Sequence, residues 1–104
     1  MTQARILSTT TDTEFSAEDL ARTSLALKLA ACVQIIPNVR SLYMWKDQIS
    51  DDKECLLQFK TSAQHIQKLM AHIKAKHTYE VPEITVIKIE EIDEDYLKWL
   101  QGVI

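Results

Sequence analysis

Two β-rich segments separated by a short polar stretch constrain this chain more than any other feature of its sequence. Residues 32–45 (CVQIIPNVRSLYMW) are rich in β-branched and aromatic side chains, and residues 53–61 (KECLLQFKT) alternate apolar and polar side chains. The polar residues 46–52 (KDQISDD) between them indicate a chain reversal. Together the three segments predict a long antiparallel hairpin whose second strand is half buried.

A proline interrupts the first strand of this hairpin. Pro37, followed by Asn38, lies inside residues 32–45. Proline has no amide hydrogen to donate to a strand ladder, so inside a sheet it is confined to edge strands and bulges. The sequence therefore predicts that this strand lies at an edge of the sheet or carries a bulge.

The other periodic segments complete a β-α-β-β-α-β order. Residues 4–11 and 83–90 favour strands because they are short and rich in β-forming side chains. The first helical stripe comprises Ala17, Leu20, Ala21, Ser24, Lys28 and Ala31, and the second comprises Ile66, Leu69, Met70, Ile73 and His77. Because the first stripe consists mostly of small side chains, its helix is expected to lie close to the sheet.

Capping residues mark where the helices are expected to begin. Thr11 with Glu14, and Thr61 with Gln64, have the spacing of a capping box. Asp93 is expected to cap a last short helix. The apolar face of that helix comprises Tyr96, Trp99, Leu100 and Val103.

This order predicts an α+β fold of the ferredoxin-like, split βαβ class, with residues 1–104 forming a single domain. Both long helices are expected on one face of an antiparallel sheet. The other face and the long hairpin carry more apolar surface than one small core absorbs. Neighbouring copies of the chain are expected to cover it, which predicts a symmetric homo-oligomer.

Composition and charge exclude several classes of function. The net charge is −3 and the basic residues are dispersed, which argues against a nucleic-acid partner. No apolar run approaches the ~20 residues that a membrane span needs. The amino-terminal residues 1–15 lack the apolar region of a signal peptide, so a cytoplasmic location is expected. Gly102 is the only glycine, which argues against a phosphate-binding glycine loop.

The sequence does not indicate an enzyme. It contains no G-x-S-x-G elbow and no H-E-x-x-H metal motif. Cys32 and Cys55 have no C-x-x-C spacing, so zinc knuckles and thioredoxin-type redox motifs are also excluded. We therefore expect a binding protein.

Three motifs resemble the CutA family of divalent-cation tolerance proteins. They are residues 25–49 (LALKLAACVQIIPNVRSLYMWKDQI), 76–84 (KHTYEVPEI) and 96–100 (YLKWL), and the resemblance runs in register from Ile6 to Leu100. It implies a ferredoxin-like fold assembled into a tight homotrimer through the long hairpins, similar to PII-type signalling proteins. It also implies an association with copper and other divalent cations in metal tolerance.

The resemblance implies metal ligands at named positions. Some family members are thought to bind metal through two cysteines and a histidine. These positions correspond here to Cys32, His77 and Ser8, and a serine hydroxyl is a far poorer ligand than a thiolate for Cu(I). Glu80, close to His77 in the sequence, is a weaker third candidate. The alternatives are that Cys32 is a buried structural thiol and that His77 binds a late carbonyl of its helix.

A second set of residues predicts a cleft between subunits. Tyr43 and Trp45 either pack at interfaces or line such a cleft, where Lys60 would attract a small anionic ligand. Tyr79 is expected to contribute its ring and hydroxyl to a cleft. A regulatory module of this kind, by analogy with PII-type trimers, is one alternative function, and a structural trimeric scaffold is another.

The hairpin also carries an acidic run and an unusual turn. Asp51, Asp52 and Glu54 are expected to form a solvated face. The glycine commonly found in the hairpin turn of the family is replaced near Asp47. Aspartate tolerates positive φ better than most residues, so the turn is expected to survive.

Overall fold

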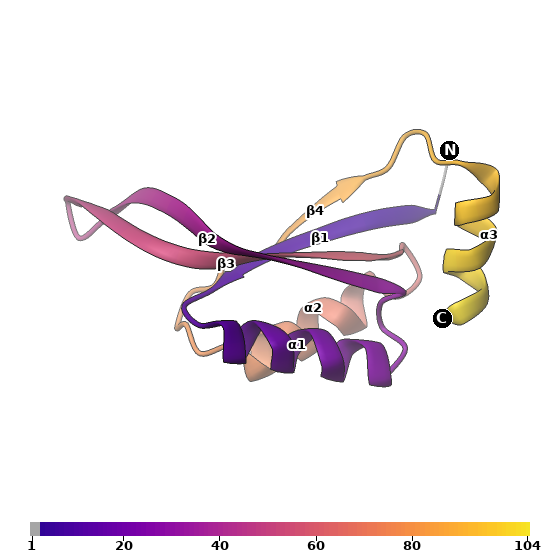
Figure 1. Ribbon diagram of the computed structural model, residues 1–104, viewed down its shortest axis with the longest axis horizontal. Coiled ribbons are helices and arrows are strands. Elements are labelled where there is room, and N and C mark those ends of the chain that lie inside the picture. Colours follow the sequence, from indigo (N-terminus) through magenta and orange to yellow (C-terminus); the bar gives the residue numbers. More distant parts are fainter. Residues whose placement is uncertain (1–2) are drawn as a thin grey trace.

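The computed structural model describes residues 3–104, and residues 1 and 2 of the predicted domain lie outside this range. It contains the predicted β-α-β-β-α-β order followed by a helix (Figure 1). The elements are β1 (Ala4–Thr11), α1 (Glu14–Ala26), β2 (Cys32–Trp45), β3 (Gln48–Ser62), α2 (Ile66–Lys76), β4 (Thr85–Lys88) and α3 (Glu94–Val103). The strands form one antiparallel sheet in the order β2-β3-β1-β4, which confirms the ferredoxin-like α+β prediction.

Both long helices pack on one face of the sheet, as predicted (Figure 1). The core between the layers includes Leu7, Leu57 and Phe59 from the sheet and Leu20, Leu69 and Ile73 from the helices, each at most 2% exposed. Residues of β1 and β3 alternate between this core and the opposite face. Leu7 pairs with Phe59 and Thr9 with Leu57, and all four are buried on the core side, whereas the residues between them are less buried. That opposite face carries no long helix and is called the open face below.

The first helix ends earlier than its apolar stripe predicted. Its residues Ala17, Leu20, Ala21 and Ser24 are buried as expected. Lys28 and Ala31, also predicted on the stripe, lie beyond Ala26, where α1 ends. The Lys28 amide donates to the Leu25 carbonyl and the Leu29 amide to the Ser24 carbonyl, which is a Schellman motif. Lys28 takes the positive φ, 58°, that glycine usually supplies there, and so the chain leaves the helix.

The two predicted capping boxes are wrong, whereas the Asp93 cap is confirmed. Thr13, not Thr11, caps α1 by accepting from the Ser16 amide at 3.0 Å. Thr61 lies in β3 and donates to the Leu29 carbonyl at 2.7 Å, and α2 begins after His65 without a side-chain cap. Both threonines are buried in strands, so a spacing that suits a cap instead serves strand contacts. Asp93 accepts from the Tyr96 amide at 3.1 Å.

The hairpin is longer and its turn tighter than predicted. Residues 48–52, expected in the reversal, belong to β3 and pair with β2 from Ser41 to Trp45. The turn consists of Lys46 and Asp47, with φ of 50° and 62°, the conformation of a two-residue type I′ turn. The positive φ expected for Asp47 is therefore confirmed. The hairpin extends well past the ends of both helices (Figure 1).

Pro37 affects the sheet in the two ways that were predicted. The strand that contains it, β2, is the edge strand of the sheet. The β2–β3 register shifts between Ile36 and Val39, and Asn38 has a φ of 60°. The proline therefore lies at a bulge, where its missing amide hydrogen interrupts no regular ladder bond.

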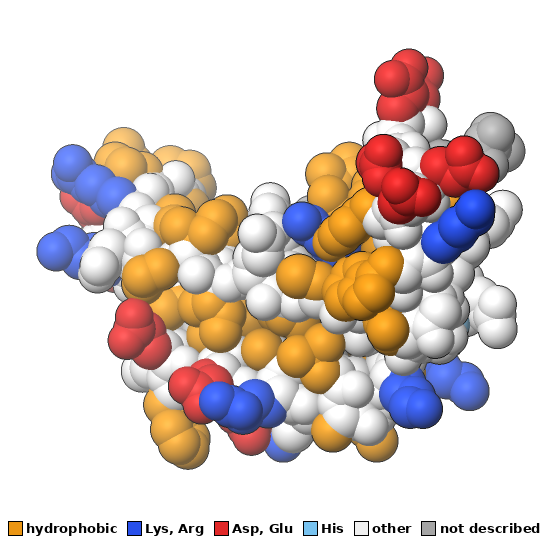
Figure 2. All heavy atoms as spheres, turned by 45° about the vertical axis from the view of Figure 1, so that its right-hand side comes forward, with side chains coloured by type: hydrophobic (Ala, Val, Ile, Leu, Met, Phe, Trp, Pro, Cys, Tyr) orange, Lys and Arg blue, Asp and Glu red, His pale blue; other side chains and the backbone are white. Residues whose placement is uncertain are grey.

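The last strand and the last helix border the open face. β4 spans only Thr85–Lys88, shorter than the predicted 83–90, and its preceding residues belong to the connection from α2. α3 buries Leu100 completely, but Trp99 remains 46% exposed. Figure 2 shows apolar side chains over the hairpin and near α3, with the surface hollowed between them.

A histidine between the helices gives the fold a pH dependence. The Thr23 hydroxyl lies 2.8 Å from the Asp19 carbonyl oxygen and shares a hydrogen bond of 2.8 Å with Nε2 of His72. Burial lowers the pKa of His72 from its ordinary value of 6.5, and repulsion by Lys76 lowers it further. The folded state therefore favours the neutral ring.

We expect wild type to lose more stability than His72→Gln when the pH falls from 7.5 to 5.5. With a lowered folded pKa, the contribution of neutral His72 is complete above about pH 6.5 and is lost as the pH falls toward the folded pKa. Urea unfolding at both pH values measures the difference. Equal losses in the two proteins would contradict the expected role of His72.

Candidate functional site

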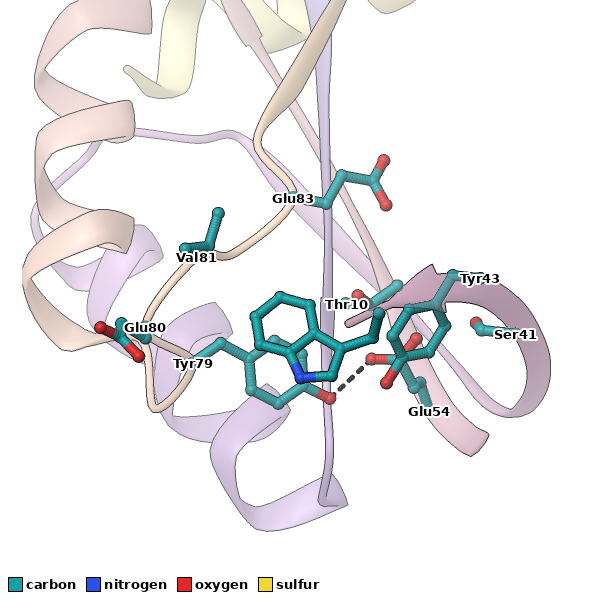
Figure 3. Close-up of a pocket in the computed structure, with 9 residues that line it drawn as sticks. Thr10, Ser41, Tyr43, Glu54, Tyr79, Glu80, Val81 and Glu83 are labelled. Carbon is teal, nitrogen blue, oxygen red and sulfur yellow. Dashed lines mark hydrogen bonds between the residues drawn. The ribbon is translucent and has the colours of Figure 1, made fainter. Parts of the chain in front are cut away.

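A cavity of about 460 Å³ opens beside the outer half of the hairpin. One wall comes from the connection between α2 and β4, and the other comes from the hairpin (Figure 3). Its lining residues are Thr10, Ser41, Tyr43, Trp45, Glu54, Tyr79, Glu80, Val81 and Glu83. Three strands and one connection thus contribute, although the residues lie far apart in the sequence.

The bulge at Pro37 decides which hairpin side chains reach this cavity. Beyond it, Val39 pairs with Glu54, Ser41 with Asp52, and Tyr43 with Ser50. Glu54 precedes the core residue Cys55 and therefore points to the open face. Its partner strand follows the same alternation, so Ser41, Tyr43 and Trp45 also lie on that face. A ladder without the one extra residue of the bulge would place them on the other side.

His77 fixes the start of the connection that forms the other wall. It is the C-cap of α2, and its amide donates to the Ile73 carbonyl at 2.8 Å. Its Nε2 lies 2.8 Å from the Thr10 carbonyl oxygen, and its Nδ1 accepts from the Tyr79 amide at 3.0 Å. Since a carbonyl only accepts, Nε2 carries the hydrogen and the ring is the neutral Nε2–H tautomer. Both ring nitrogens are therefore engaged with backbone groups.

A tyrosine–glutamate hydrogen bond joins the two walls. The Tyr79 hydroxyl donates to Oε2 of Glu54 at 2.6 Å, across the cavity in Figure 3. Burial raises the pKa of Tyr79 well above its usual value of 10, and the bond to Glu54 and its negative charge raise it further. The Tyr79 hydroxyl therefore stays a donor throughout the neutral pH range.

Tyr43 is held in a similar way on the hairpin. Its hydroxyl donates to Oδ2 of Asp52 at 2.5 Å, and this bond, followed by burial, raises the pKa of Tyr43. Arg40 on the same strand binds Asp51 through two hydrogen bonds, of 2.9 and 2.7 Å. The acidic run predicted as a solvated face is thus exposed at Asp51 and Asp52, but each of its members has a hydrogen-bond donor.

The cavity lining is negatively charged. It contains Glu54, Glu80 and Glu83 and no lysine, arginine or histidine. None of the three glutamates forms an ion pair within residues 3–104. Glu83 accepts from the Thr85 hydroxyl at 3.0 Å, and Glu80 has no hydrogen-bond partner in the described part of the chain. This charge disfavours an anionic ligand.

Three residues that were expected at a cleft between subunits, Tyr43, Trp45 and Tyr79, line this cavity within one chain. Glu80, which was expected as a metal ligand, lines it as well. Lys60 does not, because it lies near the other end of β3, with Nζ 5.7 Å from the centroid of the Tyr96 ring. The expected source of attraction for an anion is therefore absent from this lining.

The predicted metal ligands do not meet within one chain. Cys32 pairs with Lys60, whereas Thr10, which contacts His77, pairs with Leu56. The four residue steps from Leu56 to Lys60 along β3 separate the positions of Cys32 and His77 by about 13 Å in the strand direction alone. Ser8 pairs with Gln58, between the two. Among residues 3–104, no group of three His, Cys, Asp or Glu side chains is placed to hold a metal ion.

Several lining residues were missed by sequence reasoning. Glu54, Ser41, Thr10, Val81 and Glu83 were not expected at a site. The alternation around Cys55 places Glu54 away from the core, which is a usable signal. The face of the sheet on which Ser41 lies depends on the bulge at Pro37. The sequence predicts where this bulge lies, but not how many extra residues it contains.

Comparison with known proteins gives consistent matches. The family model of the CutA1 divalent ion tolerance protein matches residues 5–103. "Divalent-cation tolerance protein CutA" of Yersinia pestis is 42% identical over 89 residues, which cover 86% of this chain and 75% of the relative.

No helix among the described residues is long and apolar enough to cross a membrane.

Solved structures agree in fold over nearly the whole chain. CutA from Synechococcus elongatus has a TM-score of 0.95 and 32% identity, covering 99% of this chain and 91% of that one. The protein described as the periplasmic divalent cation tolerance protein CutA from Archaeoglobus fulgidus has a TM-score of 0.93 and 30% identity, covering 96% and 97%.

We expect Tyr79→Phe to lower the free energy of unfolding by about 1 kcal/mol, because a half-buried hydrogen bond to a carboxylate is lost. Tyr96→Phe is the matched control, since the Tyr96 hydroxyl has no hydrogen bond within the described residues. Urea unfolding at pH 7 measures both. Equal stability of the two variants would show that the bond between Tyr79 and Glu54 contributes nothing to the fold.

Proposed function

Because this chain belongs to the CutA1 divalent ion tolerance family, matched over residues 5–103, we propose that it acts in metal tolerance by binding a divalent cation, copper in particular, as a homotrimer. The family match carries this proposal. The cytoplasm is its proposed location, as expected for a protein whose two cysteines are free thiols. Cell fractionation with an antibody tests the location, and recovery from the periplasm would contradict it.

The exposed surface of the hairpin supports assembly. Leu42, Met44 and Ile49 are 61%, 66% and 73% exposed, and all lie near the turn of the hairpin, where Met44 pairs with Ile49. At the edge of the sheet, β2 presents one side without a strand partner among residues 3–104. Apolar groups and a free strand edge in one place are typical of a surface that another chain covers. Three copies related by symmetry close around such arms without leaving a free end.

We expect Met44→Lys to weaken assembly. Burying a side chain of this size stabilises an interface by about 1.5–3 kcal/mol, so its replacement by a charge lowers the association constant at least tenfold. Light scattering during size-exclusion chromatography measures the mass against the 12.0 kDa of one chain. The control is Lys53→Met, which removes a charge from the hairpin instead. A wild-type protein that stays a single chain at micromolar concentration would contradict the trimer.

Three side chains are proposed as metal ligands, namely Cys32, His77 and Glu80. Cys32 is a half-buried free thiol on the open face, and Glu80 is exposed and has no hydrogen-bond partner within the described residues. Since Cys32 and His77 lie apart within one chain, they would share an ion only across two copies. His77 must also release either the Thr10 carbonyl or the Tyr79 amide, because a metal needs a ring nitrogen lone pair. The trimer and the metal site are thus linked in this proposal.

We expect His77→Ala and Cys32→Ser each to weaken copper binding at least about tenfold. Removing a residue that only hydrogen-bonds to a metal ligand already lowers metal affinity by about that factor, and removing the ligand itself costs no less. Isothermal titration of Cu(II), and of Cu(I) without oxygen, measures affinity and stoichiometry. Binding to wild type is expected to weaken on acidification, because protons compete for the imidazole and the thiolate.

Two controls separate ligation from structural damage in this titration. His77→Gln keeps an amide donor for the Thr10 carbonyl but provides a poor metal ligand, and Glu91→Gln removes an exposed carboxylate outside the cavity. Unchanged stoichiometry and affinity in His77→Ala would remove His77 from the site. Unchanged binding in both His77→Ala and Cys32→Ser would refute the proposed ligand set.

A further inference from the structure

The cavity beside the hairpin has a chemistry that metal tolerance does not explain. Three aromatic rings, those of Tyr43, Trp45 and Tyr79, line it together with three carboxylates, those of Glu54, Glu80 and Glu83. Its volume of about 460 Å³ lies within the usual range of small-molecule sites, which is roughly 300–1,000 Å³. The lining is therefore large enough for an organic molecule and carries charge of one sign.

The charge of the lining selects for a cation. None of the three carboxylates is neutralised by a basic side chain within residues 3–104, and no basic side chain lines the cavity. The faces of tyrosine and tryptophan rings carry a negative potential and also attract cations. Carboxylates and rings therefore favour the same kind of ligand, and both repel an anion.

The geometry favours an organic cation over a metal ion. Glu54 already accepts a hydrogen bond from Tyr79, and no three potential ligands among the described residues are placed around one point. A metal ion needs such a coordination shell, whereas a protonated amine needs only one or two acceptors for its N–H groups. Glu80 has both carboxylate oxygens without a hydrogen-bond partner in the described chain, and Glu83 has one.

The apolar part of the lining suits the body of such a ligand. Trp45 is 50% exposed, Tyr43 is 42% exposed and Val81 is 74% exposed, although all three line the cavity. Covering them with an apolar group removes that surface from water. The bond between Tyr79 and Glu54 holds the walls at a fixed spacing, which reduces the ordering that binding requires.

We propose that this cavity binds a small organic cation, a protonated amine with an apolar body, which the carboxylates of Glu80 and Glu83 attract by their charge and whose body packs against Tyr43 and Trp45. This inference goes beyond the proposed metal function and does not rest on it, since no metal takes part.

Three probes of similar shape and different charge test the proposal: 2-phenylethylamine, 2-phenylethanol and 3-phenylpropionate. The full chain carries Trp99→Phe, so that Trp45 is the only tryptophan, and its emission is followed with excitation at wavelengths that the probes do not absorb. EDTA is present throughout, so that a failure here is independent of the copper titration. The amine is expected to change the emission with an affinity at least about fivefold higher than the alcohol, as about 1 kcal/mol of ion pairing gives. The propionate is expected to bind more weakly than the alcohol.

Matched variants locate the charge that is responsible. Glu80→Gln combined with Glu83→Gln is expected to remove the preference for the amine over the alcohol. The control combines Glu90→Gln with Glu91→Gln, which removes two exposed carboxylates outside the cavity and is expected to keep the preference. Thermal unfolding confirms that all variants fold.

Three outcomes would overturn the proposal. The first is equal or tighter binding of the propionate. The second is an amine preference that survives in the Glu80 and Glu83 double variant. The third is an emission of Trp45 that no probe changes, which is also the result if assembled copies fill the cavity.

Discussion

The backbone ladder between β2 and β3 is the interaction on which the rest of the structure depends. It joins the core part of the sheet, where Val33 pairs with Phe59, to an outer part that has no helix beneath it. The register shift between Ile36 and Val39 changes the facing of every residue beyond it. The same ladder therefore sets the core, positions one wall of the cavity and carries the apolar arm that the proposed trimer would cover.

The sequence predicted the parts of the fold that rest on a buried face. β1 lies where residues 4–11 were expected, and the stripe from Ile66 to Ile73 forms the buried side of α2. The hairpin turn was predicted too long because residues 48–52, apart from Ile49, are polar and have no core beneath them. A strand exposed on both faces need not alternate, so its composition resembles that of a loop. The early end of α1 depends on Lys28 adopting a conformation that its side chain does not favour.

Less of the candidate site was predictable, because it forms between segments that are distant in the sequence. Tyr43 and Trp45 were expected at a cleft and do line the cavity, but Lys60 was placed with them only by its position near a strand end. The pairing of Glu54 with Tyr79 depends on where the connection after α2 crosses the sheet, and the two hydrogen bonds of His77 fix that crossing. No periodic pattern in the sequence predicts where this connection crosses the sheet. His77 thus has a clear structural role, and the proposed metal binding would compete with it.

The bulge at Pro37 also affects the tendency of the chain to aggregate. A long, straight strand edge invites uncontrolled recruitment of further chains and the growth of fibrils. Here the outer edge of β2 is divided into the runs 32–36 and 39–45, and the proline between them offers no amide hydrogen to an incoming strand. Newly made chains therefore expose an apolar hairpin whose strand edge is poorly suited to templating amyloid.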